Sequence, residues 1–153
     1  MKTNRGKSII ILILFVLLFV SICVIISLSS GRNYSIIVEP SELFEIVNCK
    51  RSDILIVDLR DEEEYIRGHI DISINLPLDD EGEKLLEYLA RKKYDNRDIY
   101  LLCQSGYRSS SAFNILIENG YHKVHNIRFG YEEYYQCYKD DYVPAVGICN
   151  CKD

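Results

Sequence analysis

The chain carries the stretch Cys103-Gln104-Ser105-Gly106-Tyr107-Arg108-Ser109, and this stretch decides which fold and chemistry the sequence predicts. It follows the apolar run Ile99–Leu102, which has the length and character of a buried strand. It precedes residues 110–119, which are typical of a helix that Gly120 closes. A cysteine between a strand and a helix suits a reactive thiolate, because loop N–H groups and the positive end of the helix dipole stabilise negative charge.

Strand-like and helix-like segments alternate on both sides of this stretch. Short apolar runs predict strands at residues 35–38, 54–59, 73–76 and 124–127. Apolar periodicity and capping residues predict helices at residues 40–48, 61–68 and 83–93. This alternation indicates an α/β fold, with a parallel sheet of about five strands covered by helices on both faces. Ligands bind at the carboxyl ends of strands in such sheets, which is where Cys103 falls.

A long apolar run precedes the alternating segments. Lys2, Arg5 and Lys7 lie ahead of residues 9–28, which carry no charge. About 20 residues at ~1.5 Å each span roughly 30 Å, the thickness of the hydrocarbon core of a bilayer. We therefore expect a single-pass membrane anchor, or a signal helix whose cleavage would leave a secreted protein. The basic flank predicts a cytoplasmic N-terminus and an extracytoplasmic domain.

These features divide the chain into five parts. They are a basic N-terminus (1–7), the anchor or uncleaved signal (8–28), a linker (29–33), the α/β domain (34–138) and a cysteine-containing tail (139–153). All 23 acidic residues but only 15 of the 18 Lys and Arg residues follow the apolar run, which leaves that part with a formal charge of −8. Because nucleic-acid-binding domains are typically basic, we expect no nucleic-acid partner.

Three ordered motifs make the segment from about Tyr34 to Tyr138 resemble a single rhodanese domain. The first is Asp58-Leu59-Arg60 with Glu64-Tyr65 and Gly68-His69-Ile70, continued by Ile74-Asn75-Leu76-Pro77-Leu78. The second is the loop at Cys103, and Gly120-Tyr121 and Gly130-Tyr131 resemble the closing motifs. The chain departs from the family at Asp71-Ile72, where a Pro-Gly pair is common, and at Phe129-Gly130, where two glycines are usual.

The resemblance implies a sulfurtransferase. A Cys103 thiolate would take sulfane sulfur from thiosulfate or a persulfide, hold it as a cysteine persulfide and pass it to a thiol acceptor or redox protein. Arg108 and the loop amides would hold the negative charge, and neither a cofactor nor a metal ion is expected. The residues expected to bind substrate are Gln104, Ser105, Gly106, Tyr107, Arg108 and Ser109.

Two other functions on the same fold stay open. Phosphatases and arsenate reductases are one, but phosphatases of this fold place the arginine six positions after the cysteine. Arg108 follows Cys103 by five positions, which favours sulfur as the transferred atom. The other is a binding or sensing module without turnover, which a buried or disulfide-bonded Cys103 would favour.

Several further residues have structural interpretations. Asp58 and Arg60 are expected to brace the loops at the strand ends through ion pairs with neighbouring charges, and His69 is expected to be a hydrogen-bonded structural histidine. The run of residues 62–64 is interpreted as a solvated helix start that suits the helix dipole.

Three of the other five cysteines lie late in the chain. Cys137, Cys149 and Cys151 predict a disulfide that pins the tail to the domain, or a redox relay that serves Cys103. A zinc site lacks a fourth ligand at suitable spacing.

Overall fold

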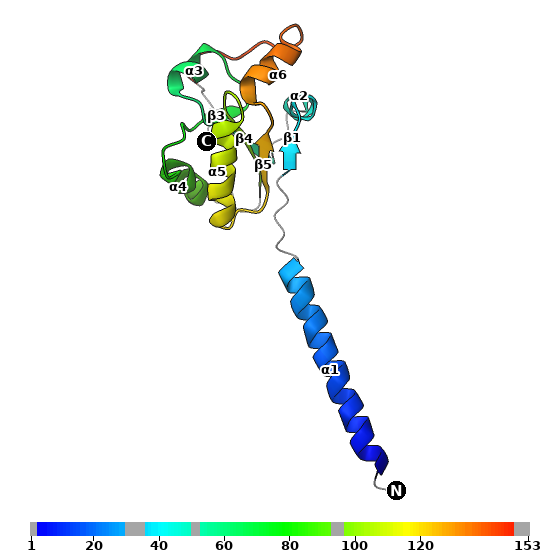
Figure 1. Cartoon of the computed structure of the whole chain (residues 1–153). Helices are drawn as coiled ribbons and strands as arrows, with labels where there is room; N and C mark the ends of the chain where they lie inside the picture. The colour runs from blue at the N-terminus through cyan, green and yellow to red at the C-terminus, as the bar shows by residue number, and fades with distance from the viewer. Residues whose placement is uncertain (1–2, 30–35, 50–52, 93–96, 149–153) are drawn as a thin grey trace. The chain divides into compact units, whose positions relative to one another are not determined.

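The structure is a computed structural model that describes residues 3–29, 36–49, 53–92 and 97–148 (Figure 1). The chain divides into two compact units, residues 1–34 and 35–153. The first contains the single helix α1 (Thr3–Ser29), on which the side chains of residues 9–24 are exposed. Among the described residues no helix is both long and apolar enough to cross a membrane, so the expected membrane helix is not supported. Residues 30–33 of the expected linker lie outside the described part.

The second unit is built on one sheet. Its strands are β1 (Ile36–Val38), β2 (Ile54–Asp58), β3 (Ser73–Asn75), β4 (Asp98–Leu102) and β5 (Val124–Ile127). They lie in the order β1-β5-β4-β2-β3, and every neighbouring pair is parallel. The five-stranded parallel sheet predicted from the sequence is therefore confirmed.

Helices cover both faces of this sheet (Figure 1). They are α2 (Pro40–Asn48), α3 (Glu62–Arg67), α4 (Glu83–Lys92), α5 (Tyr107–Glu118) and α6 (Gly130–Tyr138). Helices α2 and α6 pack on one face, and α4 and α5 pack on the other. The ends of the strands at which β4 leads into α5 carry the candidate site.

The side chains of each central strand alternate between two cores. On β2, Ile54 and Ile56 pack toward α2 and α6, whereas Leu55 and Val57 pack toward α4 and α5. Strand β4 repeats this alternation, so all the apolar side chains of both strands are buried. A strand buried on both faces needs apolar residues at every position, which is why these strands are continuous apolar runs.

The sheet register brings two loops together. Asp58, the last residue of β2, lies opposite Leu102, the last residue of β4. The next residue, Leu59, donates its backbone N–H to the carbonyl oxygen of Leu102 at 2.8 Å. The loops that follow β2 and β4 therefore start side by side at the carboxyl ends of the strands.

The chain after α6 also packs onto the domain. His69 and Ala145 exchange two backbone hydrogen bonds of 2.9 and 3.0 Å, and the Tyr142 hydroxyl donates to the carbonyl oxygen of His69 at 2.6 Å. Gly147 donates its N–H to the carbonyl oxygen of Ile66 at 2.9 Å. Residues 142–147 of the predicted tail are thus bound to the last turn of α3 and to the loop that follows it.

Candidate active site

Cys103 follows β4 directly and is fully buried. Its Sγ accepts the backbone N–H of Gly106 at 3.1 Å and that of Ser109 at 3.4 Å. The Ser109 hydroxyl oxygen lies 3.6 Å from the same sulfur. The two backbone N–H groups form a cradle that stabilises negative charge on the sulfur, whereas the Ser109 hydroxyl donates to the carbonyl oxygen of Gly106 at 3.1 Å.

The helix α5 begins at Tyr107, three residues earlier than the sequence predicts. Gly106 makes this possible, because its φ of +89° is a left-handed conformation that turns the chain directly into the helix. Its carbonyl oxygen then accepts the N–H of Ser110 at 3.2 Å. The N–H of Ser109 therefore belongs to the first turn of α5, where backbone donors are free to bind the sulfur.

The first turn of α6 holds the Cys103 loop from the other side. Tyr131 donates its N–H to the carbonyl oxygen of Cys103 at 2.7 Å, and Glu132 donates its N–H to that of Gln104 at 3.2 Å. The Gln104 amide also donates to the Glu132 carboxylate at 2.7 Å. The sequence did not predict these contacts, because backbone groups form most of them.

Gly130 lets α6 approach the loop this closely. A Cβ on this residue would lie 2.6 Å from the carbonyl oxygen of Gln104 and would also clash with the carbonyl oxygen of Cys103. Its φ of +71° adds a backbone conformation that other residues rarely adopt. The sequence signal was the glycine in Phe129-Gly130, which we interpreted only as a closing motif.

Arg108 lies on α5 beside the loop, but its guanidinium is engaged by two acidic residues. Its NH2 donates to Glu64 Oε2 at 3.0 Å, and its NH1 lies 3.6 Å from Asp61 Oδ2. Glu64 was interpreted as part of a solvated run, yet only 24% of its side chain is exposed. The spacing of Asp61 and Glu64 predicted a capping box, and this capping box is present. Nothing in the sequence indicated the contact between Glu64 and Arg108.

The contact shifts the ionisation of both partners. Burial acts to raise the pKa of Glu64. Hydrogen bonds from Arg108 and from the Asp61 N–H lower it, as does the positive charge of Arg108, and the net pKa lies below the ordinary value. Burial acts to lower the pKa of Arg108, but the bond to Glu64 and the negative charges of Glu64, Asp61 and Cys103 keep it above its usual range. Both groups are charged at neutral pH, so Arg108 is already neutralised in this structure.

Asp58 and Arg60 form a buried ion pair below the site. Arg60 donates from Nε and NH2 to the Asp58 carboxylate at 2.7–3.0 Å, and NH2 also donates to the carbonyl oxygen of Gly68 at 2.8 Å. The guanidinium carbon lies 3.9 Å from the centroid of the Tyr131 ring. The pair therefore links the loop after β2 to α6.

His69 is buried next to this pair. Its Nδ1 lies 2.9 Å from the carbonyl oxygen of Tyr65, and its ring stacks on the Tyr65 ring with 3.7 Å between centroids. These contacts fix the loop after α3 and keep the imidazole within the packed interior.

The remaining predicted residues lie apart from the sulfur cradle. Ser105 is exposed, and Tyr107 is 80% exposed and points away from the core. Cys137 carries an exposed free thiol on α6, with Sγ 3.9 Å from Glu133 Oε1. Cys149 and Cys151 lie outside the described residues, so the tail disulfide and the redox relay stay predictions.

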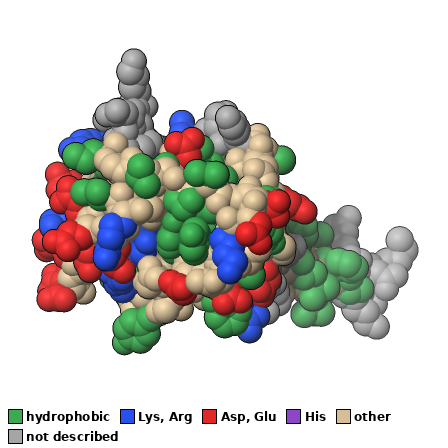
Figure 2. Space-filling view, turned by 90° about the horizontal axis from the view of Figure 1, so that it is seen from above, with side chains coloured by type: hydrophobic (Ala, Val, Ile, Leu, Met, Phe, Trp, Pro, Cys, Tyr) green, Lys and Arg blue, Asp and Glu red, His purple; other side chains and the backbone are tan. Residues whose placement is uncertain are grey.

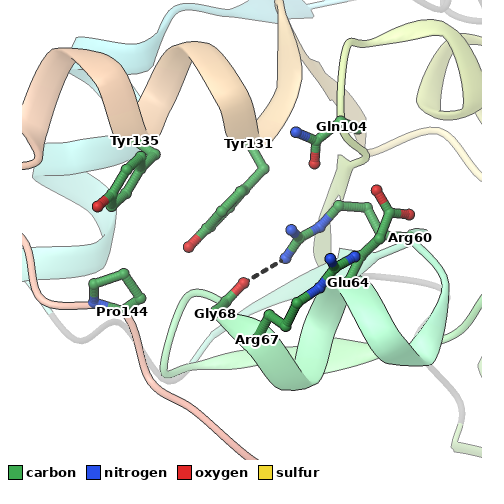
Figure 3. A pocket seen from close by; sticks show the side chains of 8 residues that line it. All are labelled: Arg60, Glu64, Arg67, Gly68, Gln104, Tyr131, Tyr135 and Pro144. Atoms are coloured by element: carbon green, nitrogen blue, oxygen red, sulfur yellow. Dashed lines mark hydrogen bonds between the residues drawn. The ribbon is translucent and has the colours of Figure 1, made fainter.

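A cavity of about 360 Å³ adjoins the loop (Figure 3). It lies between α3, the start of α6 and the 142–147 segment, and its walls include Arg60, Glu64, Arg67, Gln104, Tyr131 and Tyr135. Cys103 itself does not line it, and Gln104 is the loop residue that does. Figure 2 shows the molecule from above, with apolar side chains near the centre of the view and charged side chains of both signs around them.

Comparisons with known proteins agree with this architecture. The family model Rhodanese-like domain matches residues 39–137. A tRNA uridine(34) hydroxylase of Buchnera aphidicola is 36% identical over 81 residues, which are 52% of this chain and 26% of that protein. The protein YrkF of Bacillus subtilis, whose name proposes a sulfur-carrier role, is 35% identical over 99 residues, which are 64% of this chain and 51% of that protein.

A solved structure shares the fold. The rhodanese-like domain protein of Staphylococcus aureus is 22% identical and superposes with a TM-score of 0.57 over 72% of this chain and 97% of that one. The chain spans about half or less of the length of the two curated relatives named above.

Proposed function

Because this chain belongs to the rhodanese-like domain family, we propose that it transfers sulfane sulfur through a persulfide on Cys103. The observation that carries this proposal is the cradle of two backbone N–H groups, from Gly106 and Ser109, at 3.1 and 3.4 Å from Sγ. Donors fixed by the backbone stabilise a thiolate and the anionic persulfide formed from it, without reorganisation during the reaction.

The proposed reaction has two steps. In the first, the Cys103 thiolate attacks the outer sulfur of the donor, a new S–S bond forms and the donor S–S bond breaks. The electron pair leaves with the donor, as sulfite from thiosulfate or as a thiolate from a persulfide. In the second step an acceptor thiolate attacks the outer sulfur of the Cys103 persulfide and releases the cysteine thiolate. Covalent catalysis thus divides one difficult transfer into two easier displacements.

The elements around the loop serve this reaction by holding it in shape. The N–H groups of Tyr131 and Glu132 bind the carbonyl oxygens of the loop, so its own N–H groups stay directed at the sulfur. The buried Asp58–Arg60 pair fixes the neighbouring loop against α6. The name of the Bacillus subtilis relative supports a sulfur-handling role, although the activities of both relatives belong to longer proteins.

The test is sulfur loading of the purified full chain. The protein is incubated with thiosulfate, its intact mass is measured, and cyanide is then added and thiocyanate is assayed. We expect a mass gain of one sulfur atom and thiocyanate release, both absent in Cys103→Ser and both retained in Cys137→Ser, the matched change at an exposed thiol. If no mass gain and no thiocyanate appear with several donors, the proposal is wrong.

One observation favours a second candidate, a binding or sensing module without turnover. Cys103 is fully buried, so a donor reaches its sulfur only if the loop opens. Alkylation of the native protein with iodoacetamide separates the two functions. Modification of Cys103 supports the transferase, whereas a Cys103 that stays unmodified while Cys137 reacts supports the binding module.

We also propose that the α/β domain lies on the outer side of a membrane. The support is the order of the basic residues and the apolar run, together with exposed apolar side chains on α1, such as Phe15 and Phe19 at 67% and 68% exposure. Fractionation of cells that express the full chain, followed by protease treatment of intact cells, tests this. Recovery of the chain in the soluble cytoplasmic fraction would contradict it.

A further inference from the structure

The arginine of the site is not free to bind a doubly charged anion. Glu64 Oε2 accepts both the Arg108 guanidinium at 3.0 Å and the Asp61 N–H at 3.2 Å, and Asp61 places a second carboxylate 3.6 Å from Arg108. One positive charge therefore faces two negative charges. A dianion such as thiosulfate that approaches Arg108 meets repulsion from both acidic residues, and the partly buried Glu64 is screened less than the exposed Asp61.

Of the two arginines that line the cavity, only Arg67 is available to a ligand. Arg60 is bound by the Asp58 carboxylate and the Gly68 carbonyl oxygen. Arg67 donates only its Nε, to the carbonyl oxygen of Glu63 at 3.1 Å, and has no carboxylate partner among the described residues. A planar guanidinium of this kind is suited to a single carboxylate.

The cavity is larger than an inorganic sulfur donor requires. Its volume of about 360 Å³ falls in the range of sites for small organic molecules. Tyr131 and Tyr135 line one side with near-parallel rings whose centroids are 6.2 Å apart (Figure 3). Glu64 and Gln104 connect this space to Arg108 and to the Cys103 loop.

We propose that the sulfur donor is the persulfide of a zwitterionic, amino-acid-type thiol, and that Glu64 is the residue that selects it over thiosulfate. The carboxylate of the donor binds Arg67, its ammonium group faces Glu64, and its carbon skeleton packs against Tyr131 and Tyr135. When the loop opens and exposes the buried sulfur to this cavity, the Cys103 thiolate takes the outer sulfur, the donor S–S bond breaks, and the electron pair leaves with the amino-acid thiolate. This inference rests on the proposed sulfur transfer and names the substrate class for it.

Donor preference of the full chain tests the proposal. The rate of sulfur loading on Cys103 is measured by intact mass with thiosulfate, cysteine persulfide and cysteamine persulfide, the last of which lacks only the carboxylate. We expect wild type to prefer cysteine persulfide to both other donors. Preference for thiosulfate would overturn the inference.

Two variants, with one control, test which residues cause the donor preference. Glu64→Gln keeps a capping side chain at this helix position, and we expect it to raise the thiosulfate rate about tenfold by removing a like charge. Glu62→Gln, the same change of charge at an exposed neighbour, should leave that rate unchanged. Arg67→Gln should lower the cysteine persulfide rate roughly tenfold without changing the cysteamine persulfide rate.

The possible outcomes distinguish a wrong substrate class from a wrong proposal of sulfur transfer. If wild type takes sulfur from none of the three donors, sulfur transfer itself is wrong. If it takes sulfur but the donor ratios are the same in wild type, Glu64→Gln and Arg67→Gln, only the assignment of the substrate class is wrong.

Discussion

Tyr131 donates its backbone N–H to the carbonyl oxygen of Cys103 at 2.7 Å, so the first turn of α6 binds the same residue whose sulfur α5 cradles. The loop is held at its carbonyl oxygens by one helix and at its sulfur by the start of another. The two sets of bonds engage different atoms of Cys103, so the loop is held at both its carbonyl oxygens and its sulfur.

The closeness of α6 to the loop depends on Gly130. In Gly130→Ala the new Cβ would clash with the carbonyl groups of Cys103 and Gln104, so we expect a loss of stability of more than about 2 kcal/mol and loss of sulfur loading. Urea unfolding and intact mass measure the two effects. Gly120→Ala is the control, since Gly120 has a similar φ of +88° but nothing within 4 Å of its Cβ position. Equal losses in both variants would show that backbone strain, not the close approach, explains the effect.

The buried ion pair of Asp58 and Arg60 should matter more for the stability of the domain than its exposed ion pairs do. Because Arg60→Ala leaves a buried carboxylate without its partner, we expect it to cost about 3–5 kcal/mol of unfolding free energy. The exposed pair of Arg128 and Glu39, 2.8 Å apart against 2.7 Å for the buried pair, is the control, and Arg128→Ala should cost about 0–1 kcal/mol. Chemical unfolding of both variants checks the difference, and similar costs would contradict the account.

Tyr134 should limit stability at alkaline pH. It is fully buried, its hydroxyl has no hydrogen-bond partner in the described part of the chain, and burial raises its pKa to about 12. A raised pKa means that the folded state keeps the proton longer than the unfolded state. The stability that Tyr134 contributes is therefore complete below about pH 10, the ordinary value, and is lost as the pH rises toward 12.

Tyr134→Phe tests this directly. We expect it to raise the free energy of unfolding at neutral pH by about 1 kcal/mol, because it removes an unsatisfied buried hydroxyl, and to weaken the alkaline loss. Urea unfolding from pH 7 to pH 11 measures both effects. Tyr107→Phe removes a hydroxyl from a side chain that is 80% exposed and should change neither. A Tyr134→Phe variant less stable than wild type at pH 7 would argue for a partner of this hydroxyl.

Acid should weaken the contact between α3 and α5. The pKa of Glu64 lies below its ordinary value of 4.5, so its contribution to stability is present above that pH and is lost as the pH falls through the lowered pKa. Glu64→Gln should therefore unfold with a shallower dependence on acid than wild type. Urea unfolding between pH 3 and pH 6 measures this, and Glu62→Gln is the matched control. Parallel acid profiles for wild type and Glu64→Gln would contradict the contact.

The sequence predicted the sheet well because its central strands, β2 and β4, are buried on both faces. Residues 54–57 and 99–102 form continuous apolar runs for that reason, and the capping box of Asp61 and Glu64 marks the start of α3 within one residue. The predicted start of α5 was wrong, because Tyr107, Arg108 and Ser109 show no apolar periodicity. The turn that starts the helix comes from the left-handed conformation of Gly106, which composition does not reveal.

The contacts of the site were harder to predict for a physical reason. Arg108 and Glu64 are 44 positions apart and meet only because β2 and β4 end at the same level of the sheet. The bonds from α6 to the loop are made mainly by backbone N–H groups, which every residue but proline has. Such contacts follow from the topology, so the sequence predicts the reactive residue but not the residues that hold it and modify its charge environment.

The central claim is that Cys103 carries a transferable sulfur atom. The most direct measurement is the intact mass of the full chain after incubation with cysteine persulfide or thiosulfate, followed by peptide mapping. We predict a gain of one sulfur atom, located on Cys103, that disappears when an acceptor thiol is added and never forms in Cys103→Ser. An unchanged mass with both donors, or added sulfur that stays on Cys103 after the acceptor thiol is added, would contradict the claim.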